Sequence, residues 1–337
     1  MTSIIASKLS SPAPQSDRTQ GSSGPNFATP SLNASGDRAN LTTLWREQEV
    51  GAMYRNTEYT TAKQSPTLID YCGLTEDVLA SLTRPIRVLD MCCGAGVVAA
   101  HLQARMKKLG IERKNLVQLT CADSSTSQLE HVSARVKDQG WTDTKVVVAD
   151  IACLPFDSNS FDHVLVGNAL MVVAEPYAGL SEIFRVLKPG GRIATSTWAV
   201  EGWVDATRDA VAELRLPGSQ QPVPWPQTSY HLTRSWSPGL WEDEYFTAAM
   251  YNAAGFTTIS TKTEGTSHTF NDGQQLHTAF ETLQLGIIYR FWTAEQREKL
   301  APLLAPTISE HIRNKYGGEP FEVTRTSVFA TGMKPEA

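Results

Sequence analysis

Four acidic or amide side chains each follow an apolar stretch in the middle of the chain. They are Asp90, Asp123, Asp150 and Asn168. In a parallel α/β sheet the carboxyl ends of the strands border one crevice, and ligands bind there. A carboxylate after the second strand suits a bidentate bond to a ribose diol, whereas one after the third strand suits an exocyclic amine. We therefore expect these side chains, together with Ser124 and the apolar Ile151, to surround a nucleoside.

A turn with two glycines follows the first of these acids and precedes a predicted helix. Gly94 and Gly96 lack a Cβ, so a ligand can approach their bare backbone. The run Gly94-x-Gly96-x-x-Ala99 also fits the dinucleotide fingerprint. A pyrophosphate, however, would be repelled by Asp90, and no basic side chain is placed to meet it. A ligand with a ribose, an adenine and a positive centre fits better, which indicates S-adenosylmethionine (SAM).

The spacing of these residues requires strands and helices that alternate regularly. Continuous apolar strands separated by amphipathic helices are typical of a parallel sheet that is buried on both faces. The expected strands are 88–90, 116–121, 145–149, 163–167, 192–197, 257–262 and 323–331, the last of them antiparallel. The expected helices between the first five strands are 97–108, 127–139 and 178–187. We therefore predict an α/β fold on a doubly wound, mostly parallel, seven-stranded sheet of Rossmann-like kind.

The remaining segments differ from this core in composition. Residues 1–40 are rich in Ser, Thr, Pro, Gly and Asn and have few large apolar side chains, so we expect a disordered tail. Residues 41–337 are predicted to form a single domain. Its expected parts are a helical lid at 41–84, a cofactor-binding core at 85–198, and acceptor-side insertions at 199–254 and 271–318.

Aromatic side chains gather in the second half of the chain, where strands and helices no longer alternate. A loop is expected at 217–238, and helices at 203–214, 242–254, 274–289 and 293–315. Aromatic residues line apolar ligand pockets as well as cores. We predict that a pocket for a bulky, weakly charged acceptor is lined by Trp198, Trp203, Tyr230, His231 and Trp236.

No acid–base pair stands out among these residues. His231 is the only histidine in the aromatic loop, and it is the one candidate for a catalytic base. A thiol ionises near neutral pH and needs little assistance, whereas a hydroxyl would need a base. The sequence therefore favours a thiol, an amine or an activated carbon as the methyl acceptor.

Composition argues against several other kinds of partner. The chain has 30 Lys and Arg against 35 Asp and Glu, a net charge of −5, so neither nucleic acid nor an anionic membrane is expected. No apolar run approaches the roughly 18 residues of a membrane-spanning helix. Five cysteines, an odd number without metal-binding spacing, indicate reduced thiols, a cytoplasmic location and no metal site. We expect a monomer or a weak homodimer.

Together these motifs resemble those of the class I SAM-dependent methyltransferases. The matches at 85–198 are Asp90-x-x-x-Gly94-x-Gly96, Asp123, Asp150-Ile151-x-x-Leu154-Pro155 and Leu187-Lys188-Pro189-Gly190-Gly191. A closer resemblance, over roughly residues 45–335, is to fungal natural-product methyltransferases of the gliotoxin dithiol S-methylating type. It rests on Tyr54-x-x-Thr57-Glu58, Leu68-Ile69-Asp70-Tyr71-x-Gly73, Ser196-Thr197-Trp198 and Phe291-Trp292-Thr293-x-Glu295-Gln296-Arg297-Glu298, and on the end Ala330-Thr331-Gly332-Met333-Lys334-Pro335.

The resemblance implies a cofactor site that extends beyond the strand ends. Asp90 and the glycine turn would hold the methionine part of SAM, and Asn168 would border its methyl group. Asp123 would hold the ribose, and Asp150 the adenine amine. The full predicted set is Tyr54, Thr57, Asp90, Cys92, Gly94, Gly96, Asp123, Ser124, Asp150, Ile151 and Asn168, with the first two closing over the cofactor.

The implied function is methyl transfer from SAM to a small, largely apolar natural product in fungal secondary metabolism, at sulfur, nitrogen, oxygen or carbon. Two alternatives stay open. One is a methyltransferase-like pericyclase or cyclase that binds SAM without consuming it, and the other is a non-catalytic SAM-binding regulator. The Pro- and Trp-rich segment at 216–241 departs from the family pattern where acceptors usually bind, so the resemblance implies no particular acceptor.

Overall fold

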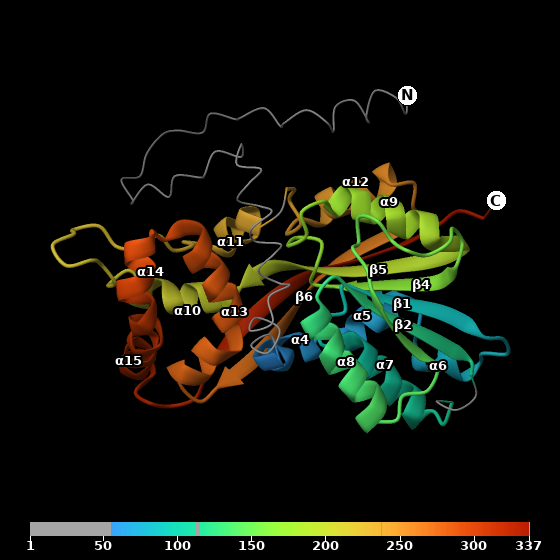
Figure 1. The fold of residues 1–337 in the computed structure, drawn as a ribbon, viewed down its shortest axis with the longest axis horizontal. Coiled ribbons are helices and arrows are strands. Elements are labelled where there is room, and N and C mark those ends of the chain that lie inside the picture. Colours follow the sequence, from blue (N-terminus) through green and yellow to red (C-terminus); the bar gives the residue numbers. More distant parts are fainter. Residues whose placement is uncertain (1–54, 112–114, 237, 337) are drawn as a thin grey trace.

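The computed structural model describes residues 55–111, 115–236 and 238–336 (Figure 1). The predicted tail at 1–40 and the predicted cofactor contact Tyr54 lie outside these residues. Within them, helices cover a central sheet, and a further group of helices lies at the end of its longest strands (Figure 1).

The sheet has seven strands in the order β3-β2-β1-β4-β5-β7-β6. Their bounds are β1 (Ile86–Met91), β2 (Val117–Asp123), β3 (Thr144–Val148), β4 (Phe161–Gly167), β5 (Leu187–Glu201), β6 (Thr257–Phe270) and β7 (Phe321–Met333). β1 to β5 pair in parallel, and β7 is antiparallel to both of its neighbours. The predicted doubly wound, mostly parallel sheet is confirmed, and the strand order reverses between β1 and β4, where ligands bind in such folds.

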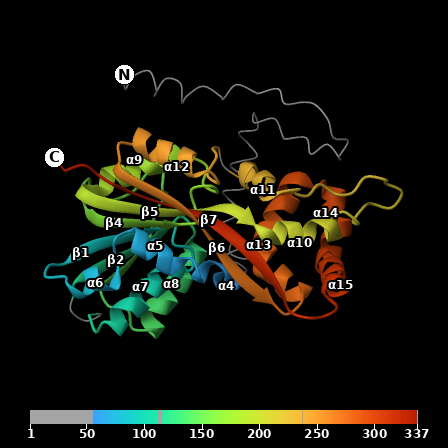
Figure 2. The same cartoon turned by 180° about the vertical axis from the view of Figure 1, so that it is seen from behind.

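Helices pack on both faces of this sheet (Figure 2). One face is covered by α5 (Ser65–Tyr71), α7 (Val97–Lys108) and α8 (Thr126–Asp138), and the other by α9 (Pro176–Val186) and α12 (Glu244–Ala253). Successive strand residues point to opposite faces, so Val88 lies in one apolar core and Leu89 in the other. The short helices before β1 are η1 (Arg55–Thr57), α4 (Glu58–Ala62) and α6 (Glu76–Ala80).

A second group of helices, here called the helical lobe, surrounds the far ends of β5, β6 and β7 (Figure 1). Its members are α10 (Gly202–Val211), α11 (Ser229–Trp236), α13 (Gly273–Phe291), α14 (Ala294–Leu300), η2 (Ala301–Leu303) and α15 (Leu304–Tyr316). The strands reach this lobe because β6 and β7 are 14 and 13 residues long, considerably longer than the sequence predicts.

Two predictions in the helical lobe are corrected by the structure. The loop expected at 217–238 contains α11, because Leu232 and Trp236 lie four residues apart and bury one helix face. Trp236 packs so closely on α13 that a Cβ at Gly286 would lie 2.0 Å from its indole ring. The helix expected at 293–315 is divided around Pro302, since proline has no N–H with which to continue a helix.

A buried ion pair joins the ends of β5 and β7 inside the helical lobe. The guanidinium of Arg325 lies 2.8 Å from the carboxylate of Glu201, and these side chains are 2% and 0% exposed. Glu201 also accepts a hydrogen bond from Trp203 Nε1 at 2.8 Å, and Arg325 donates to the carbonyl of Thr60 in α4 at 2.9 Å. The pair therefore connects the helical lobe to a helix that precedes the sheet in sequence.

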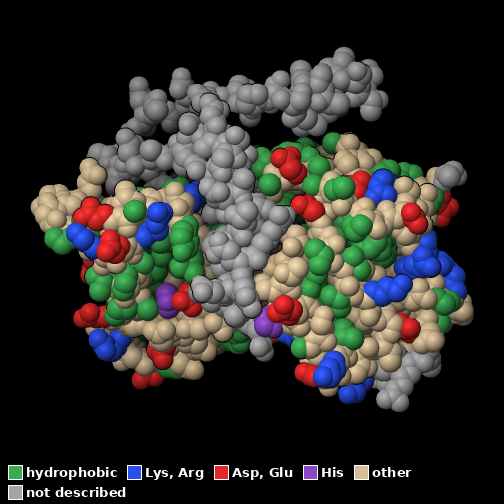
Figure 3. All heavy atoms as spheres, viewed as in Figure 1, with side chains coloured by type: hydrophobic (Ala, Val, Ile, Leu, Met, Phe, Trp, Pro, Cys, Tyr) green, Lys and Arg blue, Asp and Glu red, His purple; other side chains and the backbone are tan. Residues whose placement is uncertain are grey.

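Charged side chains of both signs are interspersed over the face shown in Figure 3. Within the described part of the chain, no helix is long and apolar enough to cross a membrane. The same residues contain no cluster of three or more His, Cys, Asp or Glu side chains that could hold a metal ion.

We expect Arg325→Met to lower the free energy of unfolding by about 3 kcal/mol, because it leaves a buried carboxylate without its countercharge. Replacing both partners, in Glu201→Leu with Arg325→Met, removes the buried charge and should recover part of this loss. Chemical denaturation of each variant measures both effects. Lys299→Met, which breaks an exposed ion pair with Glu295, serves as the control and should change little. Equal losses in the single and double variants would contradict the expectation.

Candidate functional site

The turn after β1 adopts left-handed backbone conformations. The φ angle is +55° at Cys92, +53° at Gly94 and +81° at Gly96, and α7 begins at the next residue, Val97. A Cβ on Gly96 would also lie 3.2 Å from a methyl carbon of Val132. Glycine therefore fits this position for its backbone freedom and for its small size, and the chain forms the strand, turn and helix that the sequence predicts.

Two of the predicted acids hold this turn in place. Asp90 is buried at the end of β1, and its Oδ2 accepts a hydrogen bond from the N–H of Ala99 in α7 at 3.0 Å. Asp123 accepts from the N–H of Gly94 and from the N–H of Ser125, each at 2.9 Å. A carboxylate offers about four acceptor positions, so both acids can order the loop and still accept a bond from a ligand.

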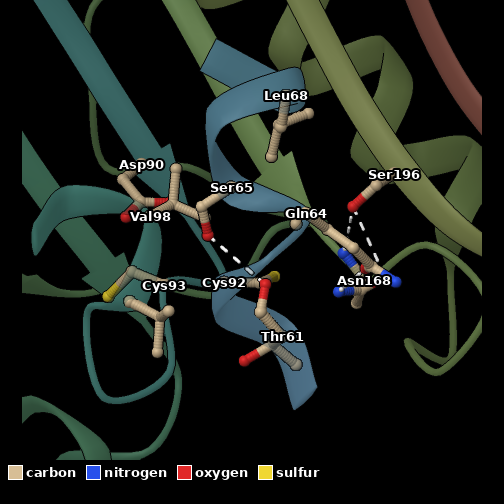
Figure 4. Close-up of a pocket in the computed structure, with 12 residues that line it drawn as sticks. Thr61, Gln64, Ser65, Leu68, Asp90, Cys92, Cys93, Val98, Asn168 and Ser196 are labelled. Carbon is tan, nitrogen blue, oxygen red and sulfur yellow. Dashed lines mark hydrogen bonds between the residues drawn. The ribbon is translucent and has the colours of Figure 1, made fainter. Parts of the chain in front are cut away.

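Two pockets adjoin at this turn and share Cys92 in their walls. The first, here called the β4 pocket, is shown in Figure 4. Its walls include Thr61, Gln64, Ser65, Asp90, Cys92, Asn168 and Ser196. The second, here called the β3 pocket, has walls that include Cys92, Ser124, Asp150, Ile151 and Glu175. Both lie at the carboxyl ends of the parallel strands.

The structure thus brings together many of the predicted cofactor residues, although not all of them. Asp90, Cys92, Ser124, Asp150, Ile151 and Asn168 line one pocket or both. Gly94, Gly96 and Asp123 shape the turn from outside the pocket walls. Thr57 is buried in η1 and does not line either pocket. That these residues contact the cofactor stays a prediction.

Several wall residues escape the sequence prediction. Gln64 and Ser65 come from α5 and its N-cap, Ser196 comes from β5, and Glu175 is the N-cap of α9. None of them belongs to a strand-end motif of the kind that reveals Asp90. Glu175 directly precedes a proline at the first turn of a helix, which is a local signal of a helix start but not of a ligand site.

The chemistry of the walls suits a cationic, non-phosphorylated nucleoside. Among the described residues that line the two pockets there is no Lys or Arg, whereas Asp90, Asp150 and Glu175 are all present. A pyrophosphate would meet these acids unfavourably, while a sulfonium and an ammonium would be attracted to them. The β3 pocket combines a carboxylate with the apolar Ile151, a combination suited to an adenine ring, so the residues fit SAM.

The carboxyl group of Asp90 has an unusual protonation equilibrium. Burial raises its pKa to about 7, the N–H of Ala99 opposes that shift, and the negative charge of Asp123 adds to it. Within the described chain, the second oxygen of this carboxyl group, Oδ1, has no hydrogen-bond partner. A cationic group of a ligand at this oxygen would favour the ionised form.

The aromatic residues predicted to line an acceptor pocket occupy different environments. Trp198, Trp203 and Trp236 are all buried in the apolar core, and neither pocket at the strand ends includes them. Trp203 is fully buried and stacks on Phe280 with ring centroids 5.2 Å apart. Trp203 thus packs the helical lobe, where Glu201 accepts a hydrogen bond from its indole N–H, and its contact with an acceptor stays a prediction.

The remaining two predicted acceptor residues lie on α11. Tyr230 is 47% exposed, and the guanidinium of Arg234 lies 4.1 Å from its ring centroid. His231 is half-buried, and burial lowers the pKa of its imidazole. Neither residue lines the β4 or the β3 pocket, and the role of His231 as a base stays a prediction.

Comparisons with known proteins agree with this geometry. The family described as "Methyltransferase domain" matches residues 89–195. The chain is 27% identical over 296 residues to acetylaranotin bis-thiomethyltransferase of Aspergillus terreus (strain NIH 2624 / FGSC A1156), a match that covers 88% of this chain and 98% of that protein. It is 26% identical over 270 residues to methyltransferase tpcH of Aspergillus fumigatus (strain ATCC MYA-4609 / CBS 101355 / FGSC A1100 / Af293), with 80% and 90% coverage.

A solved structure of phosphoethanolamine N-methyltransferase 2 of Haemonchus contortus, in complex with S-adenosyl-L-methionine, has a TM-score of 0.46 and 16% identity to this chain. The likeness covers 81% of this chain and 53% of that one.

The strand order, the glycine turn and the matching domain together define a class I methyltransferase. More specifically, the chain is a SAM-dependent methyltransferase of the fungal natural-product type, and SAM is its cofactor. When bound, SAM supplies an activated methyl group on a sulfonium, and the protein aligns that group and keeps water away from it.

We expect the affinity for S-adenosylhomocysteine to rise about tenfold between pH 6 and pH 8. The pKa of Asp90 is raised to about 7, so this group is largely protonated at pH 6 and attracts the ligand's ammonium only once it ionises. Binding should therefore release a proton near pH 7. Isothermal titration calorimetry in buffers with different ionisation enthalpies measures the affinity and the proton release together.

The control for this pH dependence is Asp90→Asn, which cannot ionise. This variant should bind S-adenosylhomocysteine more weakly at pH 8 than the unaltered protein does, with an affinity that hardly changes with pH. An affinity of the unaltered protein that is constant from pH 6 to pH 8 would show that Asp90 does not face the ammonium.

Proposed function

We propose that this methyltransferase modifies a small, largely apolar natural product of secondary metabolism, and that the acceptor atom is a thiol sulfur. The observation that carries the proposal is the pair of adjoining pockets on either side of Cys92. The β3 pocket has the groups that suit adenosine, which leaves the β4 pocket, next to Asn168, for the methionine part and the reacting methyl group.

The walls of the β4 pocket favour a thiol acceptor over a hydroxyl. The described residues that line this pocket include no Lys or His that could act as a base, and Asp90, the one acid among them, is assigned here to the ammonium of the methionine part. Burial raises the pKa of the Cys92 and Cys93 thiols well above the ordinary value, so they stay protonated. A thiol ionises near neutral pH without such help, whereas a hydroxyl requires a base.

One of the relatives also supports a thiol as the acceptor. The acetylaranotin bis-thiomethyltransferase is named for methylation at sulfur, and its likeness extends over 88% of this chain. That lobe adjoins the cofactor site, because α13 contacts η1 and α4, and Thr61 of α4 lines the β4 pocket. Its interior is built from large apolar side chains.

The proposed reaction is an in-line displacement. The acceptor thiolate forms a bond to the methyl carbon as the bond from that carbon to the sulfonium breaks, and S-adenosylhomocysteine leaves. The thiol proton passes to solvent. The protein contributes alignment and exclusion of water, which can supply a large part of the rate enhancement on their own.

Two other functions remain as rival hypotheses with the same cofactor site. A pericyclase or cyclase would bind SAM without consuming it, and a regulator would bind SAM without turnover. We expect instead that S-adenosylhomocysteine forms in step with the product. An isolated protein that rearranges its substrate without forming S-adenosylhomocysteine would support the cyclase and contradict methyl transfer.

We expect turnover with small apolar dithiols, and much slower turnover with matched compounds in which hydroxyl or amine groups replace the thiols. Incubation with SAM followed by mass spectrometry should show a mass gain of one methyl group per thiol, together with an equal amount of S-adenosylhomocysteine. Methylation of the hydroxyl or amine compounds at the same rate as the dithiols would contradict a thiol acceptor, although not methyl transfer itself.

The variant His231→Ala tests whether alignment alone suffices. A general base contributes about 10²- to 10⁴-fold, so a variant that keeps turnover within about tenfold of the unaltered protein shows that His231 is not one. We expect this result, since His231 lies outside the walls of the β4 pocket. A loss of turnover beyond 10²-fold with unchanged affinity for S-adenosylhomocysteine would restore His231 as the base.

A further inference from the structure

A chain of hydrogen bonds runs from the end of β5 to the wall of the β4 pocket. The backbone N–H of Asn168 donates to the Ser196 hydroxyl at 3.1 Å, and that hydroxyl lies 3.4 Å from Asn168 Oδ1, to which it donates. Asn168 Nδ2 then donates to Gln64 Oε1 at 3.1 Å. Asn168 holds this arrangement with a left-handed backbone, φ +53°, a conformation that asparagine tolerates better than most residues.

The hydrogen bonds of this chain run in one direction. The N–H of Asn168, which also donates to the Ser196 carbonyl at 2.9 Å, donates to the Ser196 hydroxyl oxygen, and that hydroxyl donates its own proton to Asn168 Oδ1. The amide nitrogen of Asn168 then faces Gln64, which accepts with its side-chain oxygen. The side-chain nitrogen of Gln64, Nε2, therefore remains as a hydrogen-bond donor at the end of the chain. The preceding hydrogen bonds, from Ser196 through Asn168, polarise it.

That donor is buried at the pocket and unpaired. Gln64 is 2% exposed, it lines the β4 pocket, and its Nε2 has no hydrogen-bond partner among residues 55–111, 115–236 and 238–336. A buried amide nitrogen without a partner is unfavourable, so the position indicates a ligand atom that accepts a hydrogen bond.

One unpaired hydrogen-bond donor and one unpaired acceptor therefore line the β4 pocket. Figure 4 shows Gln64, Asn168 and Ser196 on one side of it and Asp90 on the other. Gln64 Nε2 offers a donor, and Asp90 Oδ1, also without a partner in the described chain, offers an acceptor. A zwitterionic α-amino acid complements this pair, with its carboxylate toward the amide and its ammonium toward the acid.

We propose that Gln64 determines the specificity of the cofactor site for a carboxylated ligand, by donating from its side-chain amide to the carboxylate of the methionine part of SAM. This residue lies in the segment that the sequence predicts to be a lid, at the N-cap of α5. The cofactor itself thereby joins α5 to the ends of β4 and β5. The inference concerns the cofactor alone and does not depend on which acceptor is methylated.

Calorimetry with two ligands and no acceptor tests this role. The ligands are S-adenosylhomocysteine and the analogue in which its carboxylate is replaced by hydrogen, so that the ammonium and the adenosine are kept. Gln64→Leu removes the amide and should weaken S-adenosylhomocysteine binding by about 10- to 100-fold, the usual effect of losing a hydrogen bond to a charged group. The same variant should change the affinity for the analogue less than about threefold.

The ratio of the affinities for S-adenosylhomocysteine and for the analogue separates carboxylate recognition by Gln64 from a merely structural role of this residue. Gln64→Leu also frees the amide of Asn168, and a resulting distortion of the pocket would weaken both ligands equally. Gln64→Glu keeps the shape and places a negative charge opposite the carboxylate, so this variant should prefer the analogue. If Gln64→Leu does not fold, the preference of Gln64→Glu decides the question by itself.

Gln103→Leu is the matched control. Gln103 is another buried glutamine, bonded to Thr144 at 2.9 Å and outside the pocket walls, so its replacement should leave the affinity ratio unchanged. The proposal is overturned if Gln64→Leu and Gln64→Glu each weaken both ligands by the same factor, or if neither variant changes the ratio. Failure of the thiol methylation assay would leave this measurement unaffected.

Discussion

The hydrogen bonds that Asp123 accepts from Gly94 and Ser125 are the contacts on which the cofactor site most depends. They tie the end of β2 to the turn after β1, and each satisfies a backbone N–H that would otherwise be unpaired at a strand end. The turn they hold contains Cys92, the residue shared by the two pockets. A shift of this turn would therefore change both pockets together, because Cys92 lines both of them.

A second constraint joins the cofactor site to the helical lobe. β5 and β7 continue past the core, and the buried pair of Glu201 and Arg325 fixes their far ends. Since Arg325 also donates to Thr60 in α4, the helices before the sheet are held by the same group that holds the lobe. Gln64 follows α4 closely in sequence, so the position of its amide at the β4 pocket depends in part on the bond that joins Arg325 to α4.

Local sequence patterns predicted the sheet and the strand-end part of the site. Strand-end acids such as Asp90 and Asp150 could be located because a buried strand followed by a polar residue is a short-range signal. Gln64 and Ser196 carried no such signal, since each acquires its role only when two distant segments meet. The burial of Trp203 in the helical lobe could not be predicted for a related reason. An aromatic residue has the same sequence signature in a core as in a pocket, and only the packing of Phe280 against it decides between them.

The sequence by itself thus determined the class of fold, the glycine turn and the acidic character of the cofactor site. These follow from the periodicity of apolar residues and from the backbone freedom of glycine, which are properties of short segments. Only the tertiary structure decided which side chains enclose the pockets, in which direction the bonds from Ser196 to Gln64 run, and which tryptophans are core. The physical reason is that burial and hydrogen-bond pairing are relations between residues far apart in the chain, and no single segment contains them.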